Sequence, residues 1–175
     1  MISRDPFRNP EPLIRRVYAY AAYRLGDGPD AEDATQQTFE RAYRYRANFD
    51  PTKGEPVAWL LGIARRCCDD VRQGRPGHAE LGEFDQPDSG DLEPRTVRRL
   101  ELRHAVLALD ERSRDLIALR YGADLTARQI AELYGERTNA IEVALHRALA
   151  RLRAALGEAS PSEPGVATGE DPVRI

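Results

Sequence analysis

Aromatic and cationic side chains alternate along residues 39–59, and together they have a definite chemistry. The aromatic residues are Phe39, Tyr43, Tyr45, Phe49 and Trp59, and the cationic ones are Arg41, Arg44, Arg46 and Lys53. Aromatic faces stack on unpaired bases, at roughly 1–3 kcal/mol each, while cations hold the phosphates. The segment is therefore typical of a surface that binds single-stranded nucleic acid. In the alternative interpretation several of these aromatics fill the core, and we expect this of Phe39.

Other chemistry-bearing residues lack the spacing of a site. His78, His104 and His146 lie far apart in the sequence, and no run has metal-ligand spacing. Cys67 and Cys68 are adjacent and cannot staple a fold, so we interpret them as small buried or half-buried side chains in a reducing compartment. We expect neither a metal nor a cofactor.

The charge of the 175-residue chain is unevenly distributed around its net value of −3. Residues 1–75 carry net +2 and residues 98–156 carry net +3, whereas residues 76–97 carry −5 and residues 157–175 carry −3. The two acidic segments are rich in Pro, Gly and Ser, and we interpret them as a linker and a disordered tail. Because both remaining blocks are mildly basic, the overall acidity does not exclude a nucleic-acid partner.

The sequence has no obvious signal for a membrane or for export. Its apolar runs are much shorter than the roughly 20 residues of a membrane span, and residues 1–6 contain no apolar signal core. We expect a cytoplasmic protein without membrane insertion.

The apolar residues of the first block recur at helical spacing. One stripe runs from Leu13 to Leu25 and stops near residues 26–28. Asp30 is expected to cap a second helix, and residues 49–54 form a turn-rich break. A third stripe follows from Val57 to Val71, and Trp59 lies off this stripe, which favours a surface role for it.

The apolar residues of the second block also recur at helical spacing. Two stripes come first, formed by Leu102, Ala105, Val106 and Leu109, and then by Leu116, Leu119 and Tyr121. Thr126 is expected to cap a short helix that Gly135 ends, and Thr138 or Asn139 is expected to start the last helix. Two helices joined by a short turn containing Gly form a helix-turn-helix. By spacing alone, a helical hairpin that never touches DNA is an equal alternative.

These residues resemble a known family. Residues 30–39, 49–54 and 58–65 are similar to region 2 of bacterial sigma-70-type factors of the extracytoplasmic-function (ECF) subfamily. Residues 109–114, 119–121, 125–126, 130–132 and 145–153 are similar to region 4 of the same factors. Two independent matches in the right order are far more specific than a lone helix-turn-helix.

The resemblance implies an all-α fold with two small helical domains and a flexible acidic linker. Region 2 would be a three-to-four-helix bundle over residues 12–75, after an N-terminal extension of residues 1–11. Region 4 would carry the helix-turn-helix over residues 98–156. A sigma factor binds core RNA polymerase through its β′ clamp and β subunits, directs it to promoter DNA and helps to open that DNA. It makes and breaks no bond itself, so no catalytic residue is expected, and the family often has an anti-sigma factor as a further partner.

The resemblance also assigns roles to individual residues. Those expected to face the polymerase are Glu32, Asp33, Gln36, Phe39 and Arg41. Those expected at the −10 element are Tyr43, Tyr45, Phe49, Asp50, Lys53, Trp59, Arg65 and Arg66. Those expected at the −35 element are Arg128, Arg137, Thr138, Asn139, Glu142, Val143, His146 and Arg147.

Several positions depart from the family pattern. Arg66 stands where an asparagine is usual, and Glu142 and Ala144 replace two basic positions of the last helix. A carboxylate repels phosphate but can accept from cytosine N4. The −35 contact is then weaker or reads an unusual sequence, or region 4 chiefly binds a regulator. Glu136 stands where an apolar turn residue is usual, which is expected to loosen the helix-turn-helix. The alternative from another class is a stand-alone helix-turn-helix regulator.

Overall fold

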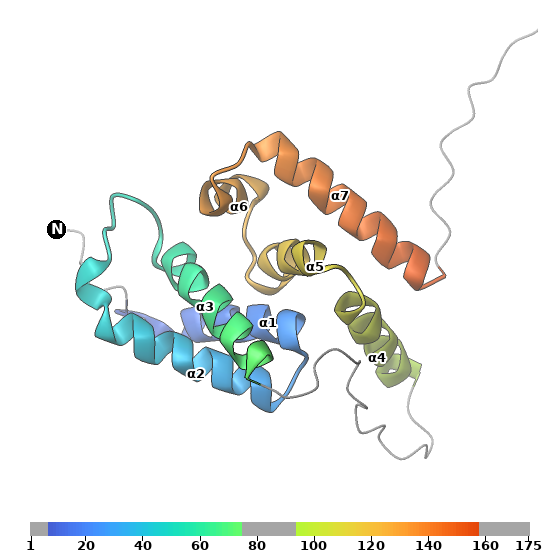
Figure 1. The fold of residues 1–175 in the computed structure, drawn as a ribbon, viewed down its shortest axis with the longest axis horizontal. Coiled ribbons are helices and arrows are strands. Elements are labelled where there is room, and N and C mark those ends of the chain that lie inside the picture. The colour runs from blue at the N-terminus through green and yellow to red at the C-terminus, as the bar shows by residue number, and fades with distance from the viewer. Residues whose placement is uncertain (1–6, 75–93, 158–175) are drawn as a thin grey trace, which may run out of the picture.

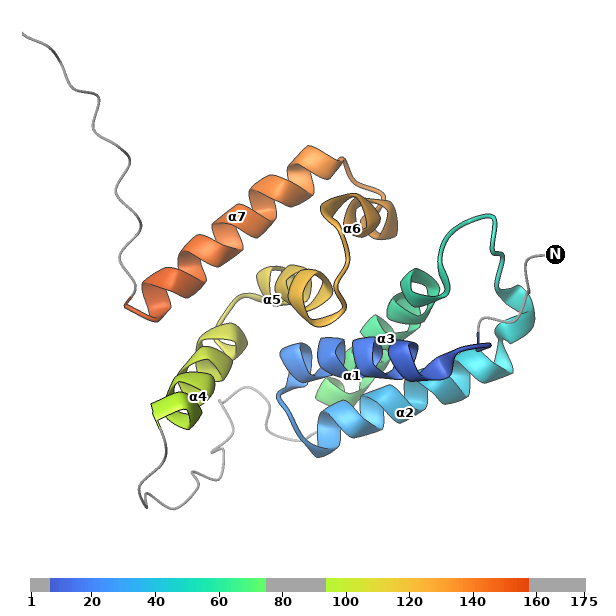
Figure 2. The ribbon, with the colours of Figure 1, turned by 180° about the vertical axis from the view of Figure 1, so that it is seen from behind.

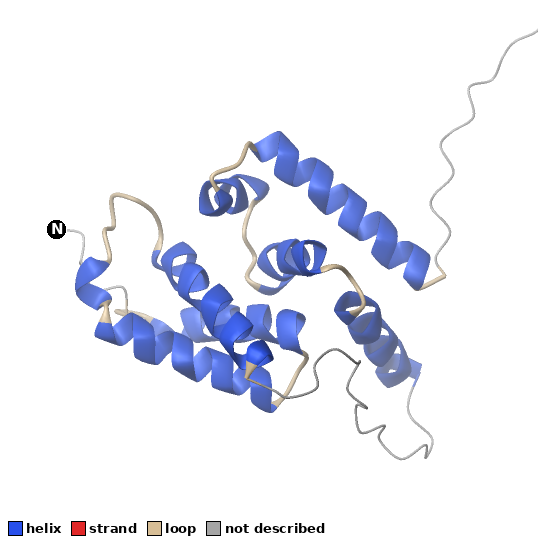
Figure 3. Ribbon diagram, viewed as in Figure 1, coloured by secondary structure: helices blue, strands red, loops and turns tan. Residues whose placement is uncertain are grey.

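The computed structural model describes residues 7–74 and 94–157, and their regular structure is helical throughout (Figures 1 and 3). The first block contains α1 (Pro10–Leu25), α2 (Pro29–Arg44), the short 3-10 helix η1 (Arg46–Asn48) and α3 (Pro56–Gln73). The second contains α4 (Pro94–Leu107), α5 (Glu111–Ile117), the π-helical turn η2 (Ala118–Gly122), α6 (Ala127–Tyr134) and α7 (Thr138–Ala155). The predicted all-α fold is confirmed. The predicted acidic linker and tail lie outside the described residues, except at their edges.

Proline marks the start of four helices, and this shifts two predicted boundaries. Pro29 begins α2 and Gly28 is its N-cap, so the prediction that Asp30 caps this helix is wrong. Pro94 begins α4, so residues 94–97 belong to a helix and not to the linker. Proline favours the first helical position because its fixed φ suits the helix and its missing N–H would have no partner there.

The first block packs its three helices around small side chains. α2 turns a face of Ala31, Ala34, Thr38 and Ala42 inward, which lets its neighbours approach closely. The predicted stripe of α3 is buried at Val57, Leu60, Leu61, Ala64, Cys67 and Cys68. Both cysteines are free, and burial raises the pKa of both thiols, that of Cys68 to about 12. They stay protonated at neutral pH, as expected of core residues.

The second block differs from the prediction at two apolar positions. Ala105, Val106 and Leu109 are buried as expected, but Leu102 is 40% exposed and Tyr121 is 50% exposed. The buried residues of α4 lie at its C-terminal end, so Leu102 faces an open groove against α1. Tyr121 lies in η2, where the wider π-helical turn rotates the side chain away from the stripe that Leu116 and Leu119 begin.

The two blocks share one hydrophobic core. Leu116 of α5, Leu119 of η2 and Ile130 of α6 belong to one cluster with buried residues of α1, α2 and α3. A second cluster joins Ile117, Ala148 and Leu152 to the C-terminal end of α4. The α1 helix is the main bridge, since Arg16 on it donates from Nε to the carbonyl of Ala123 at 2.6 Å. In Figures 1 and 2, α5 lies between the first block and α7. Two domains joined only by a linker would not need to pack against each other, and the sequence did not reveal that these two blocks do.

Gly122 permits a close approach between the backbones of the two blocks. A Cβ added there would lie 2.9 Å from the carbonyl oxygen of Ala19 and 3.0 Å from a ring carbon of Tyr23. Because the first neighbour is backbone, it cannot rotate aside. Glycine at this position therefore lets η2 pack directly against α1.

We expect Gly122→Ala to lower the free energy of unfolding by about 1–3 kcal/mol through overpacking, as measured by urea unfolding. Gly62→Ala is the matched control, because its Cβ would meet only Leu133 at 3.9 Å. Alanine in that helix interior is favoured over glycine by up to ~1 kcal/mol. Equal stability of the two variants would show that α1 and η2 do not pack closely.

Candidate functional site

The residues predicted to face the polymerase lie along the outer side of α2. Glu32, Asp33 and Gln36 are exposed, and the inward side of the same helix carries the buried alanines and threonines. Gln36 donates from Nε2 to Glu40 at 2.8 Å. The face is thus polar, acidic at its N-terminal half, and free of packing within the described part of the chain.

Phe39 and Arg41 lie at the edge of this face and are half-buried. The Phe39 ring lies 6.2 Å from that of Phe7, which also approaches Tyr43 at 6.3 Å. Arg41 donates to Asp70 of α3 at 2.7 Å, and this hydrogen bond raises the pKa of its guanidinium. Phe39 packs against the core without being fully enclosed, so the expected core role holds only in part.

The four aromatic residues predicted for the −10 element divide into an exposed pair and a packed pair. Tyr43 and Tyr45 are 62% and 51% exposed, and the Arg46 guanidinium lies 4.2 Å from the Tyr43 ring centroid. Phe49 and Trp59 are half-buried with their rings 5.5 Å apart, tilted at 51°. Aromatic stacking surface is therefore available at the end of α2 and again where the loop meets α3.

Asp50 organises the loop between η1 and α3. Its carboxylate accepts from the backbone N–H of Thr52 at 3.0 Å and from the Thr52 hydroxyl at 2.7 Å. Its carbonyl accepts from the backbone N–H of Lys53 at 3.0 Å. The Lys53 side chain is 82% exposed, with its Nζ 3.8 Å from the Asp50 carboxylate. The tight turn therefore presents a cation at its outer edge.

Arg65 and Arg66, adjacent on α3, have different surroundings. Arg66 is exposed, whereas Arg65 lies 3.1 Å from the carboxylate of Asp115 in α5. The Arg65 guanidinium also lies 4.4 Å from the ring centroid of Tyr134 in α6. One of the two arginines predicted to contact the −10 element is thus engaged by the second block.

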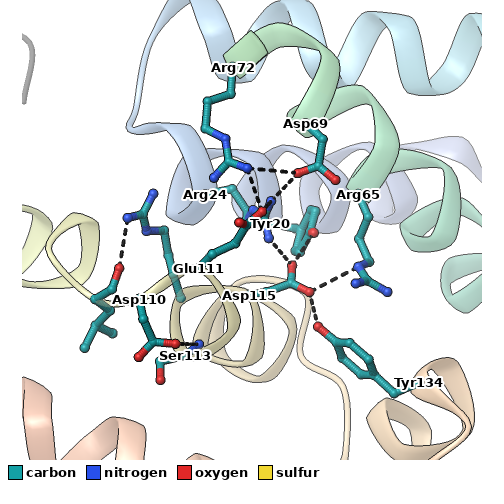
Figure 4. A network of polar contacts seen from close by, with 12 residues as sticks. Tyr20, Arg24, Arg65, Asp69, Arg72, Asp110, Glu111, Ser113, Asp115 and Tyr134 are labelled. Carbon is teal, nitrogen blue, oxygen red and sulfur yellow. Dashed lines mark hydrogen bonds and ion pairs between the residues drawn. The ribbon is translucent and has the colours of Figure 1, made fainter. Parts of the chain in front are cut away.

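Asp115 is the centre of a polar network that joins both blocks (Figure 4). Its side chain is 2% exposed. Tyr20 donates to it at 2.5 Å, Arg24 lies 2.8 Å away, and the Tyr134 hydroxyl also donates to it. With Arg65, the partners of this one carboxylate come from α1, α3 and α6.

A second layer of ion pairs surrounds this centre. Arg24 is 5% exposed and reaches Asp69 of α3 at 2.6 Å as well as Asp115. Arg72 of α3 pairs with Glu111 of α5 at 2.6 Å. Figure 4 shows Arg24 and Arg72 converging on Asp69 and Glu111. The network therefore ties α1 and α3 to α5 at several points.

Burial and charge shift the proton affinities of this network. Burial and the nearby carboxylate of Asp115 raise the pKa of the Tyr20 and Tyr134 hydroxyls, so both remain hydrogen-bond donors. Burial alone would lower the pKa of Arg24, but the surrounding negative groups outweigh it and raise that pKa. The hydrogen bond from Arg72 lowers the pKa of the Glu111 carboxyl. Both shifts favour the charged forms of Arg24 and Glu111.

The helix-turn-helix of α6 and α7 is fixed by three local features. Thr126 and Gln129 form a capping box at the start of α6, as expected for Thr126. Gly135 ends α6 with φ 68°, a left-handed conformation that glycine adopts without strain. Glu136 accepts two hydrogen bonds from Arg112 of α5, at 2.7 and 2.8 Å. Glu136 was expected to loosen this turn; in the structure its carboxylate joins the turn to α5.

The α7 helix presents one free face. Ile141, Leu145, Ala148 and Leu152 are buried against the block. The residues at its start and along it that were predicted for the −35 element are all exposed, namely Arg137, Thr138, Asn139, Glu142, Val143, His146 and Arg147. The helix begins at Thr138, which confirms one of the two predicted start residues, and its N-cap is Arg137. Arg128 lies on α6 and pairs with Glu132 at 3.1 Å.

Sequence reasoning missed the Asp115 network entirely. One signal was present, since Asp115 directly precedes an all-apolar run of four residues and a charge in such a place needs a buried partner. Tyr20 and Arg24 lie four residues apart on α1, on its apolar stripe. The partners are 95 and 91 residues away in sequence, so spacing could not connect them.

The described residues contain no group of three or more side chains suited to hold a metal ion. None of their helices is long and apolar enough to cross a membrane. The geometry instead offers an acidic face on α2, an aromatic and cationic end of α2 with its loop, and a polar face on α7.

Comparison with known proteins gives these surfaces a context. Residues 11–75 match the family Sigma-70 region 2, and residues 105–154 match Sigma-70, region 4. The two regions in this order define the class of sigma-70-type proteins. The structure is also similar to that of the sigma factor RpoE in complex with the anti-sigma factor NepR from Bartonella quintana. That similarity has a TM-score of 0.63 and 21% identity over 89% of this chain and 98% of that one, which supports the fold.

Curated relatives define the subfamily. The ECF RNA polymerase sigma factor SigL of Mycobacterium tuberculosis is 30% identical over 149 residues, 81% of this chain and 83% of SigL. The ECF RNA polymerase sigma factor SigK of Mycobacterium ulcerans is 29% identical over 152 residues, 79% of this chain and 78% of SigK. The chain belongs to the ECF RNA polymerase sigma factors.

We expect Asp115→Asn to lower the free energy of unfolding by about 3 kcal/mol or more, because it removes the buried carboxylate charge that Arg24 and Arg65 share. Chemical unfolding followed by circular dichroism measures this. The matched control is Asp124→Asn, at an exposed residue with φ 54°, a conformation that asparagine tolerates. If both variants unfold within 0.5 kcal/mol of the unchanged chain, Asp115 does not hold the blocks together.

Proposed function

We propose that this chain binds core RNA polymerase and gives it promoter specificity. The end of α2 and the loop before α3 engage the −10 element, and the free face of α7 enters the major groove at the −35 element. The observation that carries this proposal is the presence of both sigma regions in series, with the α7 face exposed. The chain acts by binding alone, and it works in the cytoplasm, where polymerase and promoters are found.

The described arrangement is a closed state that cannot hold both promoter elements. The names −10 and −35 place the elements about 25 base pairs apart, which is about 85 Å of B-DNA at 3.4 Å per base pair. A compact body of this size has a radius of gyration of only about 15 Å. Regions 2 and 4 therefore have to separate before both contact DNA.

Separation breaks the Asp115 network and releases Arg65. In the closed state this arginine pairs with Asp115 and stacks on Tyr134. Gln129 of α6 also reaches Glu55 at the start of α3, at 3.4 Å. Region 4 thus lies over part of the α3 surface that we assign to −10 recognition. Opening makes that surface available when region 4 moves to its own DNA element.

The mild charge of both regions fits a subunit that works with polymerase. Net values of +2 and +3 are small for a protein that binds DNA tightly on its own. A stand-alone helix-turn-helix regulator would also have no need of a region 2. An anti-sigma factor is a further partner under this proposal, supported by the likeness of the fold to RpoE, which was solved with NepR.

We expect the purified chain to co-elute with core polymerase in gel filtration and to support run-off transcription from a limited set of promoters. Mapping transcript starts across the genome then identifies those promoters. The control is core polymerase alone, which should give no defined starts. Binding to duplex promoter DNA without any complex with core polymerase would favour the stand-alone regulator.

We expect the regions to move apart when polymerase binds. Energy transfer between dyes at Gln73→Cys on α3 and Ala150→Cys on α7 measures this, because both positions are exposed. Maleimide would spare the native thiols, whose burial raises their pKa. Transfer should be high in the free chain and should fall when core polymerase is added.

The same dye pair tests the role of the Asp115 network. Asp115→Asn should lower the transfer even without polymerase, while Asp124→Asn leaves it unchanged. Unchanged transfer in the polymerase complex would show that the closed arrangement itself binds, contrary to the proposed opening.

A further inference from the structure

The free face of α7 carries an unneutralised carboxylate where a DNA-reading helix is usually basic or neutral. Glu142 is exposed and lies in the second turn of α7, between the buried residues Ile141 and Leu145. The N-terminal residues of a recognition helix are those that reach base edges in the major groove. The buried residues of α7 hold this helix in place, so Glu142 lies where a recognition helix contacts base edges.

Three other region 4 carboxylates near the helix-turn-helix are paired. Glu136 forms an ion pair with Arg112, Glu132 with Arg128, and Asp110 with Arg151. Among the residues that the structure describes, no hydrogen bond or ion pair engages the Glu142 side chain. Its neighbours on the free face are Asn139, Val143 and, one turn further along, His146. Its acceptor atoms are thus available to a ligand.

A carboxylate can recognise only part of the major-groove pattern. It accepts hydrogen bonds and donates none, so it matches the N4 amino group of cytosine. Guanine and thymine present acceptors at their major-groove edges, which repel a carboxylate, and adenine places its N7 acceptor beside its amino group. Of the four bases, cytosine is the best partner for Glu142.

The same charge weakens contacts with phosphate. Affinity for DNA of any sequence rests on cations that neutralise phosphates, and a carboxylate in the groove opposes this term. Glu142 therefore lowers the affinity for every DNA sequence that offers it no hydrogen-bond donor. Such a residue raises the ratio of specific to nonspecific binding at the expense of overall affinity.

We propose that Glu142 selects a cytosine within the −35 element. The inference rests on the proposed function, because it assigns the reading position of α7 to promoter DNA. Val143, which is 42% exposed, is placed to contact a neighbouring thymine methyl group. The preferred −35 sequence is then defined in part by Glu142, which accepts a hydrogen bond from cytosine and repels the acceptor edges of other bases.

The test uses the whole chain bound to core polymerase and a promoter library with a randomised −35 element. Barcoded transcripts are sequenced for the unchanged chain and for Glu142→Ala and Glu142→Gln. Glu101→Gln, at an exposed glutamate on α4, is the matched control. The library is read at two salt concentrations, so that phosphate effects are separated from base preference.

We expect one −35 position at which the unchanged chain prefers cytosine by about tenfold or more. Glu142→Ala should remove that preference, and Glu142→Gln should shift it toward adenine, the base that an amide pairs with in two hydrogen bonds. Glu101→Gln should keep the cytosine preference.

Three outcomes would overturn the inference. These are no cytosine preference in the unchanged chain, a cytosine preference that survives in Glu142→Ala, or a rise in transcription that is uniform over all sequences when Glu142 is replaced. The last outcome would mean that the carboxylate only repels phosphate. If the unchanged chain starts no transcript from any library member, the proposed function itself fails, which is a different result.

Discussion

Taking the carboxylate of Asp115 out of water is unfavourable unless donors surround it, and its donors come from three other helices. Tyr20 and Arg24 lie on α1, Arg65 on α3 and Tyr134 on α6. These groups satisfy the carboxylate together only when α5 docks on the first block with α6 alongside. The apolar contacts of η2 with α1 add buried surface to this interface, but this charge sets which arrangement of the blocks is allowed.

Arginine is the residue through which this molecule organises its charges. Lys53 is the only lysine, and it lies in an exposed loop. The guanidinium carries several donors in a fixed plane, so one arginine can hold two carboxylates, as Arg24 holds Asp69 and Asp115. Around Asp115 and Glu111 the charges between the regions are paired. On the free face of α7 they are left open to solvent, which is the condition for recognising an outside partner.

The sequence predicted the helices far better than their assembly. Apolar spacing located the stripes of α1, α3 and α7, and turn chemistry located Thr126 and Gly135, because these signals act over a few residues. Tyr121 was misplaced because a π-helical turn changes the period that the stripe assumes. The network around Asp115 was missed because its partners are distant in sequence. The roles assigned to single residues at polymerase and DNA remain predictions from the family resemblance, and the structure adds that Arg65 is engaged internally.

The π-helical turn at Ala118–Gly122 makes the orientation of the helices that follow it depend on the number of residues in the turn. One extra residue in this turn lets Gly122 lie against Ala19 and brings the Ala123 carbonyl to Arg16. Loss of any one residue between 118 and 122 would restore an ordinary helical turn and rotate everything after it by about 100° relative to α5. The helix-turn-helix could still form, but it would face a different direction. Substitutions on the outer side of this stretch are therefore compatible with the fold, whereas a single-residue deletion uncouples the two regions.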